Sequence, residues 1–115
     1  MFRKKEDIRV REVQNAMGGE GHVFFHDWLL PEEAHGHGRV FSKVVIQTGC
    51  SIGVHKHEGE FEAFYVLSGV ATVTDGDEVI TLTAGDMHMC DNGFMHGVKN
   101  NEKEDLELLA LIMKA

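Results

Sequence analysis

The chain has 115 residues, of which 43 % are hydrophobic and 26 % charged, as is typical of one folded domain and unlike a disordered chain. Its formal net charge of -8 at pH 7 argues against binding to nucleic acid or to an anionic membrane surface. No apolar run approaches the roughly 20 residues of a membrane span, and no signal-peptide core follows Met1, so we expect a cytoplasmic protein with reduced Cys50 and Cys90.

The first third of the sequence is the least regular part. A strand is expected over His22–Trp28, followed by a polar, glycine-containing loop that holds His35 and His37. We expect residues 1–39 to pack on a barrel formed by residues 40–115 and to contribute to a dimer contact, with the whole chain forming a single domain.

The remainder contains short β-rich runs separated by turns, in a chain with thirteen glycines and one proline. This pattern predicts an all-β protein with short antiparallel strands. The expected strands cover residues 40–47, 61–67, 70–74, 78–83, 87–90 and 106–113. The last run is apolar on both faces, so we expect one face to pack on the barrel and the other to contact a partner subunit, which predicts a homodimer.

Metal-ligand residue types gather in the middle of the chain. His55 and His57 are one residue apart, so on an extended backbone both imidazoles point to the same side. Glu62 follows on the next predicted strand, and His96 lies after a turn further along. Three imidazoles and one carboxylate suit one divalent ion per chain, with Mn, Fe, Co, Ni, Cu and Zn all compatible.

Two segments carry a family resemblance. Gly49 to Gly69 matches the pattern G-x5-H-x-H-x3,4-E-x6-G, and Gly85 to Asn100 matches G-x5-P-x-G-x2-H-x3-N except that Asp91 replaces the proline. The chain therefore resembles small, single-domain members of the cupin superfamily. The resemblance implies a double-stranded β-helix, or jelly-roll barrel, of the RmlC-like type. It also implies that the family's metal ligands correspond to His55, His57, Glu62 and His96. Asp91 still suits a turn.

Each of these residues also has a purely structural interpretation. The structural interpretation of the four predicted ligands is a set of hydrogen-bonded groups without an ion, although the polar atoms of converging imidazoles are then hard to satisfy. A second metal site at His35 and His37 lacks further nearby ligands, so we interpret them as solvated or as lying at the barrel mouth. The isolated residues His22, His26 and His88 are interpreted as structural histidines.

The surroundings of the site are less well defined by sequence. Glu58 and Glu60 are expected to face water, and Cys90 is expected to be a buried, inert thiol. Glu60, Tyr65 and His88 are weak candidates for a catalytic acid or base. An apolar lining around the metal is predicted from six residues, namely Phe64, Val66, Met87, Met89, Phe94 and Met95.

Four protein ligands leave one or two coordination positions open, which is typical of a catalytic or ligand-binding centre. The first hypothesis is a metal-dependent enzyme for a small oxygenated substrate, of the dioxygenase, decarboxylase or isomerase type that the resemblance implies. The alternative is a non-catalytic small-molecule-binding or sensor protein. A fused DNA-binding domain is disfavoured because no helical segment remains to form one.

Overall fold

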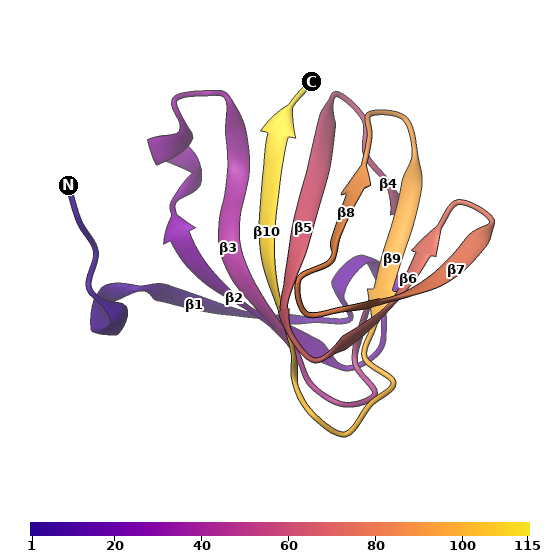
Figure 1. Ribbon diagram of the computed structural model, residues 1–115. Coiled ribbons are helices and arrows are strands. Elements are labelled where there is room, and N and C mark those ends of the chain that lie inside the picture. The colour runs from indigo at the N-terminus through magenta and orange to yellow at the C-terminus, as the bar shows by residue number, and fades with distance from the viewer.

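The computed structural model describes residues 1–115 and consists of two antiparallel sheets (Figure 1). The larger sheet has the order β1-β2-β3-β10-β5-β8, and the smaller sheet has the order β4-β9-β6-β7. The strands are β1 Arg9–Gln14, β2 His22–Leu29, β3 Gly38–Ile46, β4 Ser51–Lys56, β5 Glu60–Ser68, β6 Val70–Asp75, β7 Glu78–Thr83, β8 Met87–Cys90, β9 Met95–Lys99 and β10 Leu106–Lys114. This arrangement confirms the predicted all-β jelly-roll barrel.

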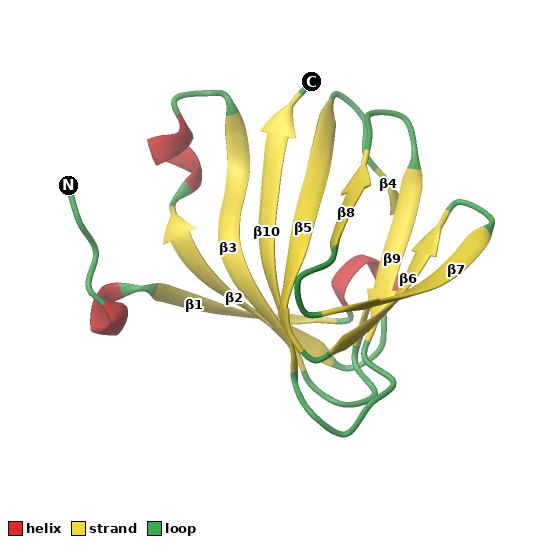
Figure 2. Ribbon diagram, viewed as in Figure 1, coloured by secondary structure: helices red, strands yellow, loops and turns green.

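Helical structure is limited to short 3-10 turns (Figure 2). They are η1 Lys5–Asp7, η2 Ala16–Gly18 and η3 Pro31–Ala34. None of them has the length or apolar character that a membrane-crossing helix requires.

Three strands have no counterpart in the sequence prediction, namely β1, β4 and β9. Strand β1 alternates arginine with valine and glutamate rather than apolar with polar residues, because its arginines pair with a buried carboxylate on β2. Strand β4 contains Gly53, and its pairing with β9 shifts register between Ile52 and His55. Glycine and a bulge both weaken the period-two signal by which a strand is recognised.

The core lies between the sheets and is formed by the inward faces of the long strands. In β3 the buried residues are Val40, Ser42, Val44 and Ile46, which is the alternation that the sequence predicted. In β10 they are Leu106, Leu108, Ala110 and Ile112. Because β10 lies between β3 and β5, its inward side chains join the two halves of the larger sheet into one core.

Two motif residues without ligand roles fix the chain at one end of the barrel. Gly69 has φ +86°, and a Cβ atom there would lie 2.5 Å from the carbonyl oxygen of Asp105, so a larger residue would push the two segments apart. The buried amide of Asn100 donates hydrogen bonds to the carbonyl oxygens of Ile46 (2.8 Å) and Glu104 (2.7 Å).

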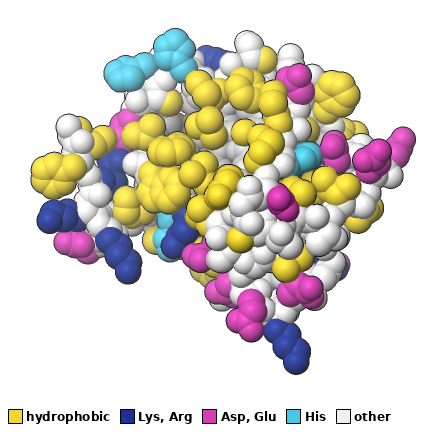
Figure 3. Space-filling model, in the orientation of Figure 1, with side chains coloured by type: hydrophobic (Ala, Val, Ile, Leu, Met, Phe, Trp, Pro, Cys, Tyr) yellow, Lys and Arg dark blue, Asp and Glu magenta, His cyan; other side chains and the backbone are white.

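The outer face of the larger sheet is apolar. Tyr65, Leu67, Met87 and Met89 are all exposed on β5 and β8. Figure 3 shows hydrophobic side chains spread over the middle of the visible face, where β3, β10 and β5 run. We call Tyr65, Leu67, Met87 and Met89 the outer apolar face.

Candidate metal centre

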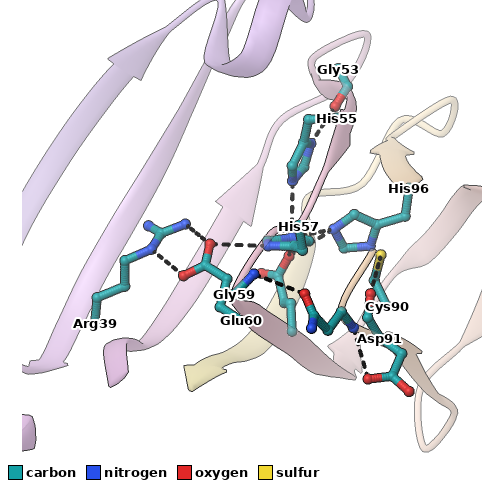
Figure 4. Close-up of polar contacts among 11 residues, drawn as sticks. Arg39, Gly53, His55, His57, Gly59, Glu60, Cys90, Asp91 and His96 are labelled. Carbon is teal, nitrogen blue, oxygen red and sulfur yellow. Dashed lines mark hydrogen bonds and ion pairs between the residues drawn. The ribbon is translucent and has the colours of Figure 1, made fainter. Parts of the chain in front are cut away.

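Three strands and the turn after one of them bring the four predicted ligands together inside the barrel, and Figure 4 shows the three histidines among them. His55 lies on β4, directly opposite His96 of β9, and His57 follows the end of β4. Glu62 comes from β5 in the facing sheet. One donor atom from each of the four residues lies within 4.8 Å of the others, so the structure assembles the set that the sequence predicted.

The imidazoles meet through their Nε2 atoms. The Nε2 of His57 is 3.2 Å from that of His55 and 3.0 Å from that of His96. The Oε1 atom of Glu62 is 3.2 Å from the Nε2 of His57 and 2.8 Å from the Nε2 of His96. Glu62 therefore closes the group from the opposite sheet.

In His55 and His57, the contact made by the Nδ1 atom determines whether the Nε2 atom presents a lone pair to the centre. The Nδ1 of His55 is 2.7 Å from the carbonyl oxygen of Gly53, and the Nδ1 of His57 is 3.2 Å from Oε1 of Glu60. A carbonyl or carboxylate oxygen only accepts, so both Nδ1 atoms carry the proton and, in the neutral rings, both Nε2 atoms present lone pairs. Lone pairs and a carboxylate facing one point fit a divalent cation.

Backbone packing holds the partner of His55 in place. Gly53 lies against the η2 turn, where a Cβ atom would collide with the carbonyl oxygen of Met17. Met17 and Asn15 both have φ +50°, a left-handed conformation that is uncommon for residues other than glycine. The turn between β1 and β2 thus sits directly on the backbone that orients His55.

Glu60 links the centre to β3. It accepts a bidentate pair from Arg39, at 2.9 Å from Nε and 2.7 Å from Nη2, while its Oε1 contacts His57. The hydrogen bond from Arg39, despite partial burial, lowers the pKa of Glu60. The prediction that Glu60 faces water is wrong, because these two partners hold the carboxylate. Glu58, in contrast, is exposed as predicted.

The protonation of the protein groups without an ion follows from their contacts. Burial by itself would raise the pKa of Glu62, but without an ion His57 and His96 donate hydrogen bonds to it when their Nε2 atoms carry protons, and these bonds outweigh burial and hold the pKa at about 2. The same carboxylate raises the pKa of His57. Burial lowers the pKa of His55. The group therefore combines a permanent negative charge with an imidazole that is held in the neutral form.

Away from Glu62 and His57, the His96 ring is packed rather than hydrogen-bonded. The ring of His88 stacks on His96 at a centroid distance of 5.3 Å and contacts Phe64 at 5.0 Å. The Nε2 of His88 and the Nδ1 of His96 are buried without hydrogen-bond partners. Burial lowers the pKa of His88, so this ring is neutral at pH 7. Cys90 is fully buried nearby, and its thiol pKa is raised to about 11 by burial.

The opposite side opens into a cavity of about 190 Å³. His55, His57 and Glu62 line it, but His96 does not. The other lining residues are Arg11, Val13, Ala16, Met17, Phe25, Arg39, Val40, Ile52 and Ile112. These residues come mainly from β1, β2, β3 and the η2 turn.

The predicted methionine lining is wrong. Met87, Met89 and Met95, like Phe94, are about half exposed or more, whereas Phe64 and Val66 are buried. Strand alternation explains the result for the methionines, because His88 and Cys90 point inward on β8 and His96 points inward on β9, so Met87, Met89 and Met95, which alternate with them, must point outward. The true apolar lining comes from Ile112 and from six residues between positions 13 and 52. Those that precede β3 lie in a region whose weak strand pattern gave no signal of proximity to the metal ligands.

The remaining histidines and Tyr65 lie away from the centre. His35 and His37 are exposed near η3, as predicted, and His22 pairs with Glu12 on β1. Tyr65 is exposed on the outer apolar face. Among the weak catalytic candidates, only Glu60 and His88 contact metal-ligand candidates, and neither lines the cavity.

Known proteins resemble this chain in both sequence and structure. Residues 42–112 match the family model described as the Cupin domain. An "Oxalate-binding protein" of Thermotoga maritima is 35 % identical over 113 residues, covering 98 % of this chain and 93 % of the relative. A crystal structure described as a predicted oxalate decarboxylase from the same organism superposes with a TM-score of 0.94 at 35 % identity, covering 100 % of both chains. An RmlC-like cupin from Shewanella frigidimarina has a TM-score of 0.79 at 18 % identity, covering 99 % of this chain and 90 % of that structure.

Proposed function

This chain belongs to the cupin family, and from that premise we propose that it holds one divalent transition metal and binds a small carboxylate at it. His55, His57, Glu62 and His96 are the proposed ligands, and Mn, Fe, Ni, Co, Cu and Zn are compatible ions. When bound, such an ion supplies a Lewis-acid centre that accepts carboxylate oxygens.

One observation carries the proposal. The donor atoms of the four residues lie within 4.8 Å of one another, and the group borders a cavity on only one side. With four protein donors, an ion that prefers five or six ligands keeps positions free, and these positions face the cavity. A small ligand that enters the cavity therefore reaches the ion directly.

The surroundings favour an anion. Arg11 and Arg39 line the cavity, and guanidinium groups recognise carboxylates in planar, paired geometry. The 35 % identical relative is described as oxalate-binding. We take oxalate as the reference ligand because its two carboxylates supply two adjacent oxygen donors to one ion.

Binding without turnover is the function that we favour over catalysis. Apart from the proposed metal ligands, the only ionisable groups lining the cavity are the two arginines, which stay protonated at neutral pH. Proton transfer by a positioned acid or base therefore has no candidate within the cavity. The alternative, a metal-dependent oxidoreductase or decarboxylase, rests on the family and on the structural relative described as a predicted oxalate decarboxylase.

The metal part of the proposal is tested by inductively coupled plasma mass spectrometry on untagged protein. We expect close to one transition-metal ion per chain, and loss of that ion when His55 and His57 are both changed to alanine. A His35→Ala/His37→Ala variant has the same one-residue spacing on an exposed loop and should keep the ion. Equal metal content in all three proteins would refute the assignment of the site.

The ligand part is tested by isothermal titration calorimetry with oxalate on the metal-loaded and the metal-free protein. We expect binding only to the loaded protein. Carbon dioxide release measured on the same samples separates binding from catalysis, because steady release after mixing would establish turnover and contradict a purely binding role.

We also propose that the protein is a cytoplasmic homodimer that buries the outer apolar face between two copies. The accessible surface is 6709 Å², against about 6,300 Å² for a typical folded monomer of this mass. Tyr65, Leu67, Met87 and Met89 form an exposed apolar group of the kind that subunit contacts cover. Light scattering should give twice the chain mass, and Leu67→Lys should reduce it to the mass of one chain.

A further inference from the structure

The cavity beside the proposed metal centre has two chemically different sides. On one side are the donor groups of His55, His57 and Glu62. The rest of the lining is largely aliphatic and aromatic and comes from separate parts of the chain, among them Val13 of β1 and Phe25 of β2. A ligand in this space is therefore close both to the groups that would hold the metal ion and to apolar side chains.

The apolar wall is not simply closed core. Val13, Phe25 and Ile52 are only partly buried, and they pack against the core cluster while also lining the cavity. Met17 is 57 % exposed on the η2 turn and lines the same space. Apolar surface that borders a solvent-accessible cavity next to a polar group is typical of a small-molecule site, in which it receives the apolar part of the ligand.

Two cations complete the cavity. Arg11 holds Asp27 through Nε and Nη2, and Arg39 holds Glu60 through the same two nitrogens. In both residues Nη1 has no partner in the structure. The Arg11 guanidinium lies 4.7 Å from the centroid of the Phe25 ring, which fixes its plane against the apolar wall. Both residues line the cavity, so the ligand is expected to be an anion.

The size of the space exceeds what a bare dicarboxylate uses. A volume of about 190 Å³ corresponds to about six water molecules. Oxalate has no carbon outside its two carboxylates and would leave the apolar wall hydrated. Covering that wall is favourable by about 25 cal/mol for each Å² removed from water.

We propose that the preferred ligand is a small 2-oxo or 2-hydroxy carboxylate with a short apolar side chain. This inference rests on the proposed metal-dependent binding of carboxylates. The carboxylate and its neighbouring oxygen take the open metal positions, and the side chain lies against Val13, Phe25 and Ile52. Arg11 and Arg39 attract the anion and offer their free Nη1 groups to carboxylate oxygens.

The test is a chain-length series measured by isothermal titration calorimetry on Co²⁺-loaded protein, with glyoxylate, pyruvate, 2-oxobutanoate and 2-oxopentanoate as probes and oxalate as the reference. We expect the affinity to rise about fourfold for each added methylene, the ratio that corresponds to about 0.8 kcal/mol. The heat capacity of binding should become more negative along the series.

The outcomes separate this inference from the function on which it rests. If oxalate binds but affinity stays constant or falls along the 2-oxo series, the proposed function stands and the apolar-tail inference is refuted. If neither oxalate nor any 2-oxo acid binds the loaded protein, the proposed function fails and the inference fails with it. A rise along the series supports both.

A matched pair of variants assigns the effect to the wall. Val13→Thr keeps the shape of the side chain but makes it polar, and it should weaken 2-oxopentanoate severalfold while leaving oxalate unchanged. Val10→Thr makes the same change on the exposed face of the same strand and should leave both affinities unchanged. Equal effects of the two variants on 2-oxopentanoate would contradict the contact.

Discussion

The two halves of the candidate metal centre are held by different forces. On the cavity side, the Nδ1 atoms of His55 and His57 are oriented by Gly53 and Glu60. On the opposite side, His96 has no hydrogen-bond partner on its Nδ1 and is held by the stacked ring of His88. Hydrogen bonds therefore fix the ring orientation on the side where ligands exchange, and dense packing closes the side that no ligand enters.

The largest effect should come from removing the packed half. We expect His96→Ala to lower the free energy of unfolding of the metal-free protein by about 2–4 kcal/mol, because it leaves a hole beside Phe64 and His88. His57→Ala should cost clearly less, because it removes close approaches to two imidazoles, His55 at 3.2 Å and His96 at 3.0 Å, whereas His96→Ala removes only one. Urea unfolding of both metal-free variants measures the difference, and equal losses would break the distinction between the halves.

The hydrogen-bonded half extends across the cavity to Asp27, which receives bonds from Arg11, Ser42 and Arg9. Burial would raise its pKa, but these bonds outweigh burial and hold the pKa at about 2, below the ordinary 3.8. A lowered pKa stabilises the fold above pH 4, and this contribution is lost as the pH falls from about 4 to 2.

We therefore expect Asp27→Asn to cost about 2 kcal/mol of unfolding free energy at pH 7, the value that the lowered pKa implies. The difference between the variant and the wild type should shrink as the pH falls toward 2. Urea unfolding at several pH values between 2 and 7 measures it. A difference that is independent of pH would show that packing, rather than charge, explains the cost.

Glu60→Gln tests the hydrogen-bonded half at the metal itself. The amide occupies the same space but pairs less well with Arg39 and with the Nδ1 proton of His57, so we expect metal affinity to fall tenfold to a hundredfold. Chelator competition measures it. Glu58→Gln changes a carboxylate two residues earlier that is exposed to solvent and should leave the affinity unchanged. A comparable loss there would point to overall charge.

The smallest effect is expected at His88. His88→Phe keeps an aromatic ring on His96 and removes a buried nitrogen that has no partner, so the free energy of unfolding should stay constant or rise by about 1 kcal/mol. Metal affinity should remain within about threefold. A large loss of affinity would mean that a ring nitrogen of His88 contributes to metal binding and that the packed half acts through more than packing.

The difference between the halves also explains what the sequence could predict. His55, His57, Glu62 and His96 were found because strand geometry and a family pattern fix their spacing. Each motif lies within one local stretch of the chain. The fold followed from similar local signals, since β3 alternates clearly and β5 and β10 are apolar, β-rich runs.

The supporting residues could not be found in that way. Glu60 lies between two ligands and looks like a solvated loop residue, and only its contact with Arg39 on β3 reveals its place. Val13 and Phe25 come from a hairpin that joins the centre through long-range pairing of β2 with β3. Contacts between distant segments leave no periodic signal in a single sequence. The outward direction of Met87 and Met89, however, follows from His88 facing inward.

Because His96 closes one side of the centre, a ligand can approach from one direction only. The lining around that opening is not uniform, since β1 and β2 supply the apolar Val13 and Phe25 while β3 supplies the cationic Arg39. When a 2-hydroxy acid chelates the ion, the hydrogen atom and the side chain on its C2 carbon must then lie in different surroundings. The two enantiomers are therefore not equivalent to this protein. From a racemic mixture, the metal-loaded chain should bind one enantiomer more tightly than the other.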